Sequence, residues 1–202
     1  MGMIENWKSV LTQPKETFAK RKKEADFMAA MKPYAIVGGV IGLLIGVAVA
    51  LFAGILSLVP GLGILVGLGF LAIPVLAIGV AVLEVIASLV MSALMFVFAK
   101  LLGGSGDFKT HYFLPSLYVI PVAVLTIVLN VIPFIGPLLG FVLAIYSLYL
   151  MTLSLKETHG FGTGKAILVW LLPVILAIVL AVLFAGATIA ALMAASAASR
   201  AA

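Results

Sequence analysis

Long apolar segments, separated by short polar breaks, dominate this 202-residue chain. The longest segment extends from Gly61 to Leu102 and is interrupted only by Glu84 and Lys100. About 20 apolar residues suffice to cross the hydrocarbon core of a bilayer, and this chain has several such runs. Only 9% of its residues are charged, against roughly 25% in soluble proteins. The sequence therefore predicts an all-α, polytopic transmembrane helical bundle.

The positive charges predict how this bundle crosses the membrane, because cytoplasmic loops retain Lys and Arg. Five spans with an inside N-terminus would place eleven of the twelve Lys and Arg residues inside and only Arg200 outside. The eleven are Lys8, Lys15, Lys20, Arg21, Lys22, Lys23, Lys32, Lys100, Lys109, Lys156 and Lys165. Six spans would leave eight inside and four outside. We therefore expect five spans, a cytoplasmic N-terminus and an outside C-terminus.

The predicted spans divide the chain into a segment 1–32, a membrane domain 33–190 and an Ala-rich tail 191–202. Residues 61–102 are too long for one membrane-crossing helix, which would measure roughly 60 Å, about twice the hydrocarbon thickness. Either Gly61–Ile73 is a re-entrant or interfacial piece, or the segment forms two short spans. Taking the first solution, the five spans are Tyr34–Val59, Val75–Lys100, Leu114–Val131, Leu138–Leu155 and Ala166–Ala187.

The first 32 residues are polar but amphipathic. Trp7, Leu11, Pro14 and Phe18 are spaced to share one helical face, and the basic run Lys20–Lys23 follows. Such a pattern is typical of a helix lying in the membrane interface, although a solvated segment that only sets topology is the alternative. No cleavable signal peptide is expected here, since an apolar core is missing. The candidate contacts to lipid headgroups are Trp7, Lys20, Arg21, Lys22 and Lys23.

Small residues recur every four positions in the first span. This stripe comprises Gly38, Gly42, Gly46, Ala50 and Gly54. Small residues at that spacing allow another helix to approach closely, and we expect a neighbour from the same chain.

Glu84 is the single acidic side chain inside a predicted span, which makes it a candidate for function. A neutral Glu84 could hydrogen-bond Ser88 or Asn130 within the bundle. A structural polar contact is the favoured role, and contact with an ion or substrate is the alternative.

The remaining residues offer no recognisable catalytic, cofactor or metal site. The chain has no Cys, and His111 and His159 fall in polar breaks, where we expect them to be solvated. A metal site would need three or four ligands at suitable spacing. The net charge of +5 gathers at predicted membrane edges, which indicates contact with lipid headgroups and not with nucleic acid.

Several short motifs occur in a characteristic order along the chain. Those near the N-terminus are Trp7, Val10-Leu11, Pro14 and Phe18. The later ones are Leu102-Gly103-Gly104, Phe108, Pro121, Ile132-Pro133, Gly136, Tyr146, Leu153, Leu155-Lys156-Glu157, His159-Gly160 and Lys165-Ala166. Their order and spacing resemble the Yip1 family of membrane proteins. The resemblance implies five spans, a cytosolic N-terminus and a role in trafficking or membrane organisation.

Eukaryotic members of the family associate with prenylated Rab GTPases and with one another. This chain lacks their long cytosolic N-terminal region, which argues against a GTPase partner and suggests the cell membrane of a prokaryote. We expect a non-enzymatic scaffold or adaptor whose partners are membrane lipids, itself or other membrane proteins. The alternatives are a small transporter or channel using Glu84 and a helix break at Pro60–Pro74, and a lipid-handling protein.

Overall fold

The computed structural model describes residues 3–201, which form seven α-helices and one 3-10 turn. In chain order these are α1 (Met3–Thr12), α2 (Pro14–Arg21), η1 (Lys22–Glu24), α3 (Phe27–Leu56), α4 (Ile64–Leu101), α5 (Phe108–Asn130), α6 (Ile135–His159) and α7 (Thr163–Ala201). The helices α3 to α7 are long and apolar enough to cross a membrane. The predicted fold class and the five apolar helices are therefore confirmed. The predicted tail forms part of α7 as far as Ala201, and Ala202 lies outside the described residues.

Aspartates determine where α3 and α5 begin. The Asp26 side chain accepts a hydrogen bond from the backbone N–H of Ala29, and Asp107 accepts one from the N–H of Thr110. These bonds satisfy N–H groups that the first turn of a helix cannot pair internally. Each helix consequently starts about two turns before its apolar segment, earlier than the spans predicted from hydrophobicity alone.

The prediction of a separate re-entrant piece at Gly61–Ile73 was wrong. From Ile64 onward this segment forms the first part of α4, which continues through Pro74 to Leu101. The turn lies instead between Leu56 and Ile64, where Gly61 adopts a positive φ of 90°. With 38 residues, α4 is roughly 57 Å long at 1.5 Å per residue. This segment is therefore a single helix, although it is much longer than the hydrocarbon core is thick.

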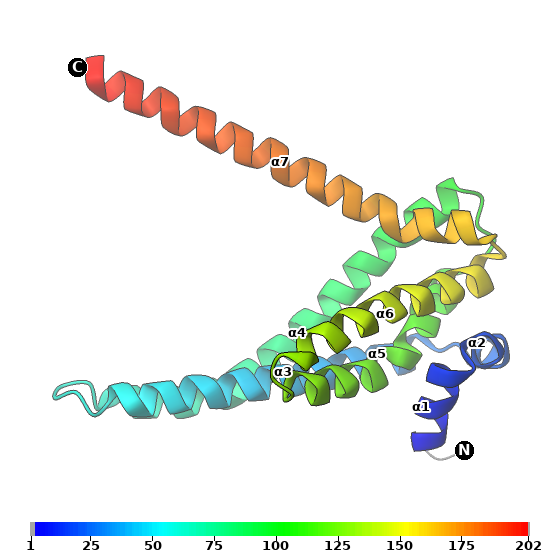
Figure 1. The fold of residues 1–202 in the computed structure, drawn as a ribbon, viewed down its shortest axis with the longest axis horizontal. Helices are drawn as coiled ribbons and strands as arrows, with labels where there is room; N and C mark the ends of the chain where they lie inside the picture. Colours follow the sequence, from blue (N-terminus) through cyan, green and yellow to red (C-terminus); the bar gives the residue numbers. More distant parts are fainter. Residues whose placement is uncertain (1–2, 202) are drawn as a thin grey trace.

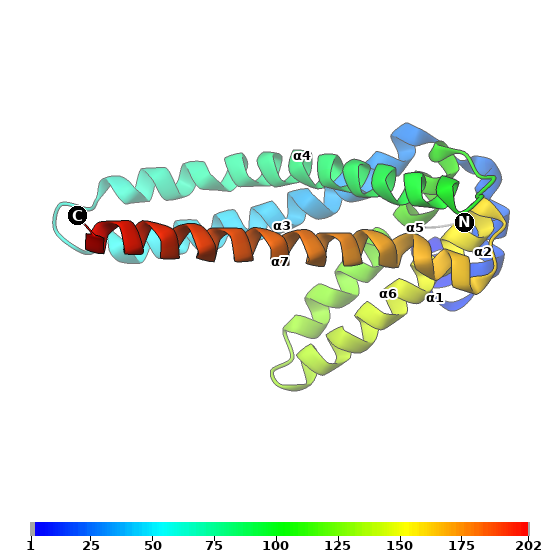
Figure 2. The same cartoon turned by 90° about the horizontal axis from the view of Figure 1, so that it is seen from above.

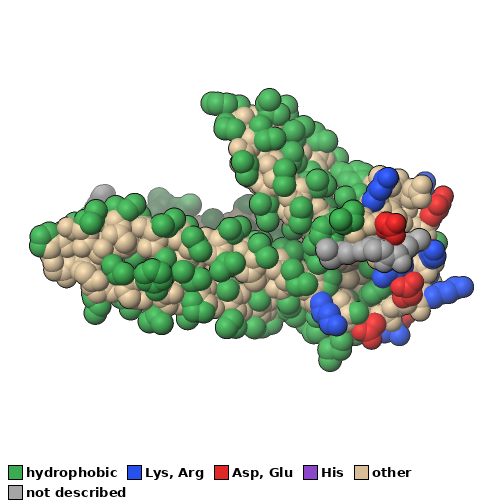
Figure 3. Space-filling view, turned by 90° about the horizontal axis from the view of Figure 1, so that it is seen from below, with side chains coloured by type: hydrophobic (Ala, Val, Ile, Leu, Met, Phe, Trp, Pro, Cys, Tyr) green, Lys and Arg blue, Asp and Glu red, His purple; other side chains and the backbone are tan. Residues whose placement is uncertain are grey.

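The five long helices form three arms that diverge from one end of the molecule (Figures 1 and 2). The first arm is the α3–α4 hairpin, the second is the α5–α6 hairpin, and the third is α7 alone. We call their common end, which also holds α1, α2 and the α4–α5 and α6–α7 loops, the basal end. Charged side chains gather there, while apolar side chains cover the visible parts of the arms (Figure 3). The C-terminus lies at the far tip of α7.

The buried core also lies at the basal end, in two clusters. The first brings together side chains of α1, α2, α3, α5 and α6, namely Val10, Phe18, Ala30, Tyr112, Phe113, Leu114, Tyr118, Leu150 and Leu153. The second joins α4, α6, the α6–α7 loop and α7 through Met95, Ala99, Leu155, Phe161, Ala166 and Val169. These clusters hold the three arms together at their common end.

The small-residue stripe of α3 lies against α4. A Cβ atom added at Gly42 would come within 2.2 Å of the Leu76 carbonyl oxygen, and one at Gly46 within 2.7 Å of the Ile73 Cα. Gly69 of α4 faces Ala50 in the same way, at 2.9 Å from its Cα. At Gly54 an added Cβ would meet no atom within 4 Å. Backbone-to-backbone contact therefore extends along most of the stripe and ends before Gly54.

Gly42→Ala should destabilise the α3–α4 hairpin by about 1–3 kcal/mol, because the new methyl group cannot fit without separating the helices. The matched substitution Gly54→Ala should be neutral or stabilising by up to about 1 kcal/mol, because alanine favours helix and has room there. Unfolding of both variants in detergent measures the two effects. Equal effects at both positions would show that contact with α4 does not limit position 42.

Candidate functional site

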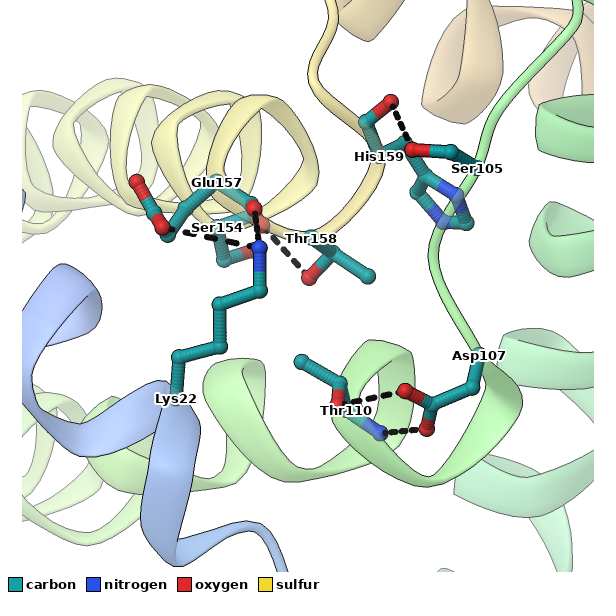
Figure 4. Close-up of polar contacts among 8 residues, drawn as sticks. All are labelled: Lys22, Ser105, Asp107, Thr110, Ser154, Glu157, Thr158 and His159. Carbon is teal, nitrogen blue, oxygen red and sulfur yellow. Dashed lines mark hydrogen bonds and ion pairs between the residues drawn. The ribbon is translucent and has the colours of Figure 1, made fainter.

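Polar side chains from several elements meet at the basal end (Figure 4). We call this cluster the polar junction; it comprises Lys22, Ser105, Asp107, Thr110, His111, Ser154, Glu157, Thr158 and His159. Its centre is the contact between the α4–α5 loop and the last turn of α6. The hydroxyl of Ser105 donates to the carbonyl oxygen of His159 at 3.2 Å, and the Ser105 N–H donates to the same oxygen at 3.4 Å. The α6 terminus thereby gains partners for an otherwise unpaired carbonyl.

Glycines allow the α4–α5 loop to reach α6. A Cβ atom at Gly104 would lie 2.6 Å from Nδ1 of His159, and one at Gly106 would lie 2.4 Å from the carbonyl oxygen of Thr158. The run Gly103-Gly104-Ser105-Gly106 is therefore more than a flexible connection, because two of its glycines are sites of close approach. Any larger residue there would push the loop away from the α6 terminus.

A pair of buried histidines links α5 to α6 beneath this loop. Nδ1 of His111 lies 2.9 Å from Nε2 of His159, and the two side chains are 1% and 3% exposed. Aromatic rings of Phe96, Phe108 and Phe161 surround the pair. The prediction that both histidines are solvated was wrong. Within the described residues no third His, Cys, Asp or Glu joins them to form a metal-binding group.

Lys22 ties the N-terminal segment to the polar junction. Its Nζ donates to the carbonyl oxygen of Glu157 at 2.5 Å and lies 3.6 Å from the Glu157 carboxylate. A second tie joins the hydroxyl of Tyr146 to the carbonyl oxygen of Leu11. Together these bonds connect η1 and α1 to α6, so the N-terminal segment is fastened across the basal end.

The N-terminal segment differs from the single interfacial helix expected from its sequence. It forms two helices, which meet at Gln13, with Pro14 at the first position of the second. Val10 and Phe18 are 1% and 0% exposed and belong to the core cluster with α5 and α6. Of the face predicted to enter the lipid interface, Pro14 and Phe18 are buried and Leu11 packs against this cluster, so that part of the face contacts the protein itself.

Of the residues predicted to contact lipid headgroups, some are exposed and others bind groups of the protein. Lys20 and Lys23 are exposed, whereas Lys22 binds Glu157. Arg21 forms an ion pair with Glu24 and lies 3.5 Å from the side-chain oxygen of Asn6. Trp7 is half-buried between the N-terminal segment and the arms. Contact of these residues with lipid remains a proposal.

Glu84 and Ser88 lie near the aromatic packing of α3 and α5, but Asn130 does not join them. The hydroxyls of Ser88 and Tyr112 are 2.9 Å apart, and Glu84 faces α3, where a Cβ atom added at Gly38 would lie 2.7 Å from the Glu84 Cβ. Asn130 lies roughly 27 Å farther along α5, where its amide donates to the carbonyl oxygen of Thr126. The suggested hydrogen bond between Glu84 and Asn130 was therefore wrong.

The polar junction was missed because its members are far apart in the sequence and individually ordinary. A signal was nevertheless present: the Leu102-Gly103-Gly104 and His159-Gly160 motifs, which carried part of the family resemblance, lie against each other here. Gly160 ends α6 in a left-handed conformation with φ of 71°. The two motifs thus form one structural unit.

The five apolar helices and the charged basal end define an integral, multi-pass membrane protein. The model of the Yip1 domain matches residues 8–185, which is most of the chain, and the protein therefore belongs to the Yip1 family. The match includes most of the N-terminal segment and all of the polar junction. No curated protein and no solved structure matches the chain.

Lys22→Met should release the N-terminal segment from the basal end. Loss of a charged hydrogen bond of about 1.5–3 kcal/mol should increase local opening by roughly tenfold or more. Limited trypsin digestion at Lys15 and Lys20, in detergent, measures this opening. Lys23→Met is the matched control. Lys23 is exposed, and its replacement removes one trypsin site just as the replacement of Lys22 does. Equal cleavage rates in the two variants would show that the Lys22 contacts do not hold the segment.

Asp107 should make stability depend on acid pH. Burial would raise the pKa of this carboxyl, but hydrogen bonds from the Thr110 backbone N–H and hydroxyl outweigh burial and hold its pKa below 3.8. A lowered pKa stabilises the fold above about pH 3.8, and this contribution is lost as pH falls through the folded-state pKa. Asp107→Asn keeps a capping side chain without the charge, which is worth about 0.3–1 kcal/mol at a helix N-terminus. Unfolding midpoints measured against pH should show a gap at neutral pH that closes in acid; a gap independent of pH would contradict this role.

Proposed function

We propose that this Yip1-family protein is a non-enzymatic scaffold or adaptor in membrane organisation. The observation that carries the proposal is the distribution of contacts. Buried core residues gather at the basal end, whereas the three arms carry mostly exposed apolar side chains along their lengths. Such arms can bind other membrane helices or lipids laterally while the basal end keeps them in a fixed arrangement.

The third arm gives this proposal its clearest support. Residues 174–194 of α7 are all exposed, including large side chains such as Leu183 and Phe184. In contrast, Ala166 and Val169 at the start of α7 are fully buried. One end of the helix is therefore anchored in the core, and the remainder offers its whole circumference to partners within the membrane.

The polar groups of the basal end support a structural role. The side chains of Ser105, Thr110 and Lys22 each donate a hydrogen bond to another group of the chain. Lys165 donates to the carbonyl oxygen of Leu102, and Trp170 donates to the hydroxyl of Thr152. These bonds join the loops and helix ends to one another, which is what a rigid platform requires.

A transporter or channel is the second candidate, because Glu84 lies in an apolar helix long enough to cross the membrane, where it faces Gly38 of α3. Transporters often place such residues at unwound helices. However, α4 runs without interruption through Pro74, so the Pro60–Pro74 break that would have supported this candidate does not exist within the helix.

We further propose that the basal end faces the cytoplasm of a cell whose plasma membrane holds the protein. Its eleven Lys and Arg residues support this orientation, since positive residues are retained on the cytoplasmic side. The C-terminus would then lie outside. Partners in this arrangement are membrane lipids, a second copy of the chain or other membrane proteins.

Site-directed photo-crosslinking in native membranes, paired with a flux assay, tests the scaffold. A photoreactive residue at Leu183 should yield discrete protein adducts, and one at the buried Leu150 should yield only intramolecular products. Proteoliposomes containing the wild type or Glu84→Gln should show equal fluxes of protons, common cations and small anions, no higher than empty vesicles. Flux that disappears in Glu84→Gln would overturn the scaffold and establish the transporter. Adducts to lipid alone at Leu183 would also contradict a scaffold for proteins.

A further inference from the structure

A polar cavity of about 460 Å³ lies between α1 and α2 at the basal end. Two cations, Lys20 and Arg21, and two carboxylates, Glu16 and Glu24, line it. Its formal charge is therefore balanced, although the N-terminal segment as a whole is strongly basic. A headgroup with one negative and one positive charge complements such a cavity better than a purely anionic headgroup.

A second cavity, of about 230 Å³, continues from the first toward the arms. Arg21, Asn6 and Thr17 line both cavities, so the two are adjacent. The second cavity adds Trp7 and, from α5, apolar residues that include Ile120. Its lining is therefore mixed, with polar groups toward α2 and apolar groups toward α5. Trp favours the boundary between the polar and apolar layers of a membrane, which suits this position.

A third cavity, of about 320 Å³, lies between α3 and α5. Ile120 lines it as well as the second cavity, and Val40 and Val124 form part of its walls. Its one polar side chain is Thr126, whose hydroxyl donates to the Val122 carbonyl oxygen of its own helix. This cavity therefore offers an apolar surface within the membrane-spanning part of the chain.

The three adjacent cavities change from charged to mixed to apolar, which is the order of groups along a phospholipid. We propose that they bind one phospholipid with an amine-bearing headgroup, of the phosphatidylethanolamine type. Lys20 and Arg21, which keeps its ion pair with Glu24, would hold its phosphate, and Glu16 and the remaining oxygen of Glu24 would accept hydrogen bonds from its ammonium group. The acyl region would pass Trp7 and enter the groove between α3 and α5. This inference stands independently of the scaffold proposal.

The headgroup distinguishes this lipid from the other common phospholipids. A phosphatidylglycerol headgroup would bring a phosphate to these charged side chains but no cation for Glu16, whereas Glu24 already pairs with Arg21. A choline headgroup carries a cation that has no N–H to donate. Of the three headgroups, the ethanolamine type alone brings both a phosphate for the two cations and N–H donors for the carboxylates, and it is therefore the occupant that the lining favours.

The fluorescence of Trp7 provides a local test, because the chain has only two Trp residues. Trp170→Phe leaves Trp7 as the single fluorophore, beside the predicted acyl chain. This protein is reconstituted in choline-lipid vesicles that contain an equal small fraction of a chain-brominated ethanolamine, glycerol or choline phospholipid. Bromine quenches Trp on contact, and we expect the ethanolamine lipid to quench Trp7 severalfold more than the other two. The Trp7→Phe protein, which reports on Trp170, should be quenched equally by all three.

Matched variants in the Trp170→Phe background separate binding from bulk lipid contact. Arg21→Ala should reduce quenching by the ethanolamine lipid to the level of the other lipids, whereas Lys15→Ala, which alters an exposed cation outside the two cavities, should not. Ala123→Phe should fill the α3–α5 groove and remove the preference, whereas Ala87→Phe on the exposed face of α4 should retain it. Because Arg21→Ala also breaks the contacts of Arg21 within the N-terminal segment, Glu16→Gln provides a second headgroup variant. Equal quenching by all three lipids, or an ethanolamine preference that survives both Arg21→Ala and Glu16→Gln, would overturn the proposal.

Discussion

The packing around Tyr112 holds the basal end together, and the arrangement of the arms depends on it. This fully buried ring stacks on Tyr34 of α3 and on Phe108, and its hydroxyl lies 2.9 Å from that of Ser88 in α4. One side chain of α5 thus contacts both helices of the first arm. The adjacent histidine pair joins α5 to α6 in turn. A chain of buried aromatic and imidazole rings therefore connects two arms that otherwise diverge.

The arms diverge because the force that packs helices together in water is absent within the membrane. Apolar burial drives helix association in water, but lipid tails are as apolar as leucine and provide no such force between arms. Within the membrane, helices stay together where small residues permit close packing, as Gly42 and Gly46 do between α3 and α4. The exposed part of α7 has an isolated glycine, Gly186, where an added Cβ would touch nothing. The α3–α4 hairpin and α7 thus differ in the spacing of their glycines.

That difference also explains which features could be predicted from the sequence. The apolar helices and the small-residue stripe depend on local composition and on the spacing of residues. They can therefore be predicted from a single sequence. The histidine pair and the Lys22–Glu157 tie depend on which distant segments meet, and polar breaks that look alike in sequence do not reveal this. The N-terminal amphipathic pattern predicted an apolar face for a lipid interface, but a face that includes Phe18 fits a protein core as well. The sequence pattern of an apolar face does not show whether that face packs against protein or against lipid.

The unequal lengths of the arms constrain how the protein can sit in a bilayer. With 23 and 25 residues, α5 and α6 extend roughly 35–38 Å, which matches a hydrocarbon core of about 30 Å with modest tilt. With 38 and 39 residues, α4 and α7 reach nearly 60 Å and must tilt strongly or extend beyond the core. Because the arms share the basal end, they cannot all stand along the membrane normal, and their divergence allows the long helices to tilt while the short pair remains upright. If all five helices cross the bilayer, the shared basal end therefore requires the long helices to tilt more than the short pair.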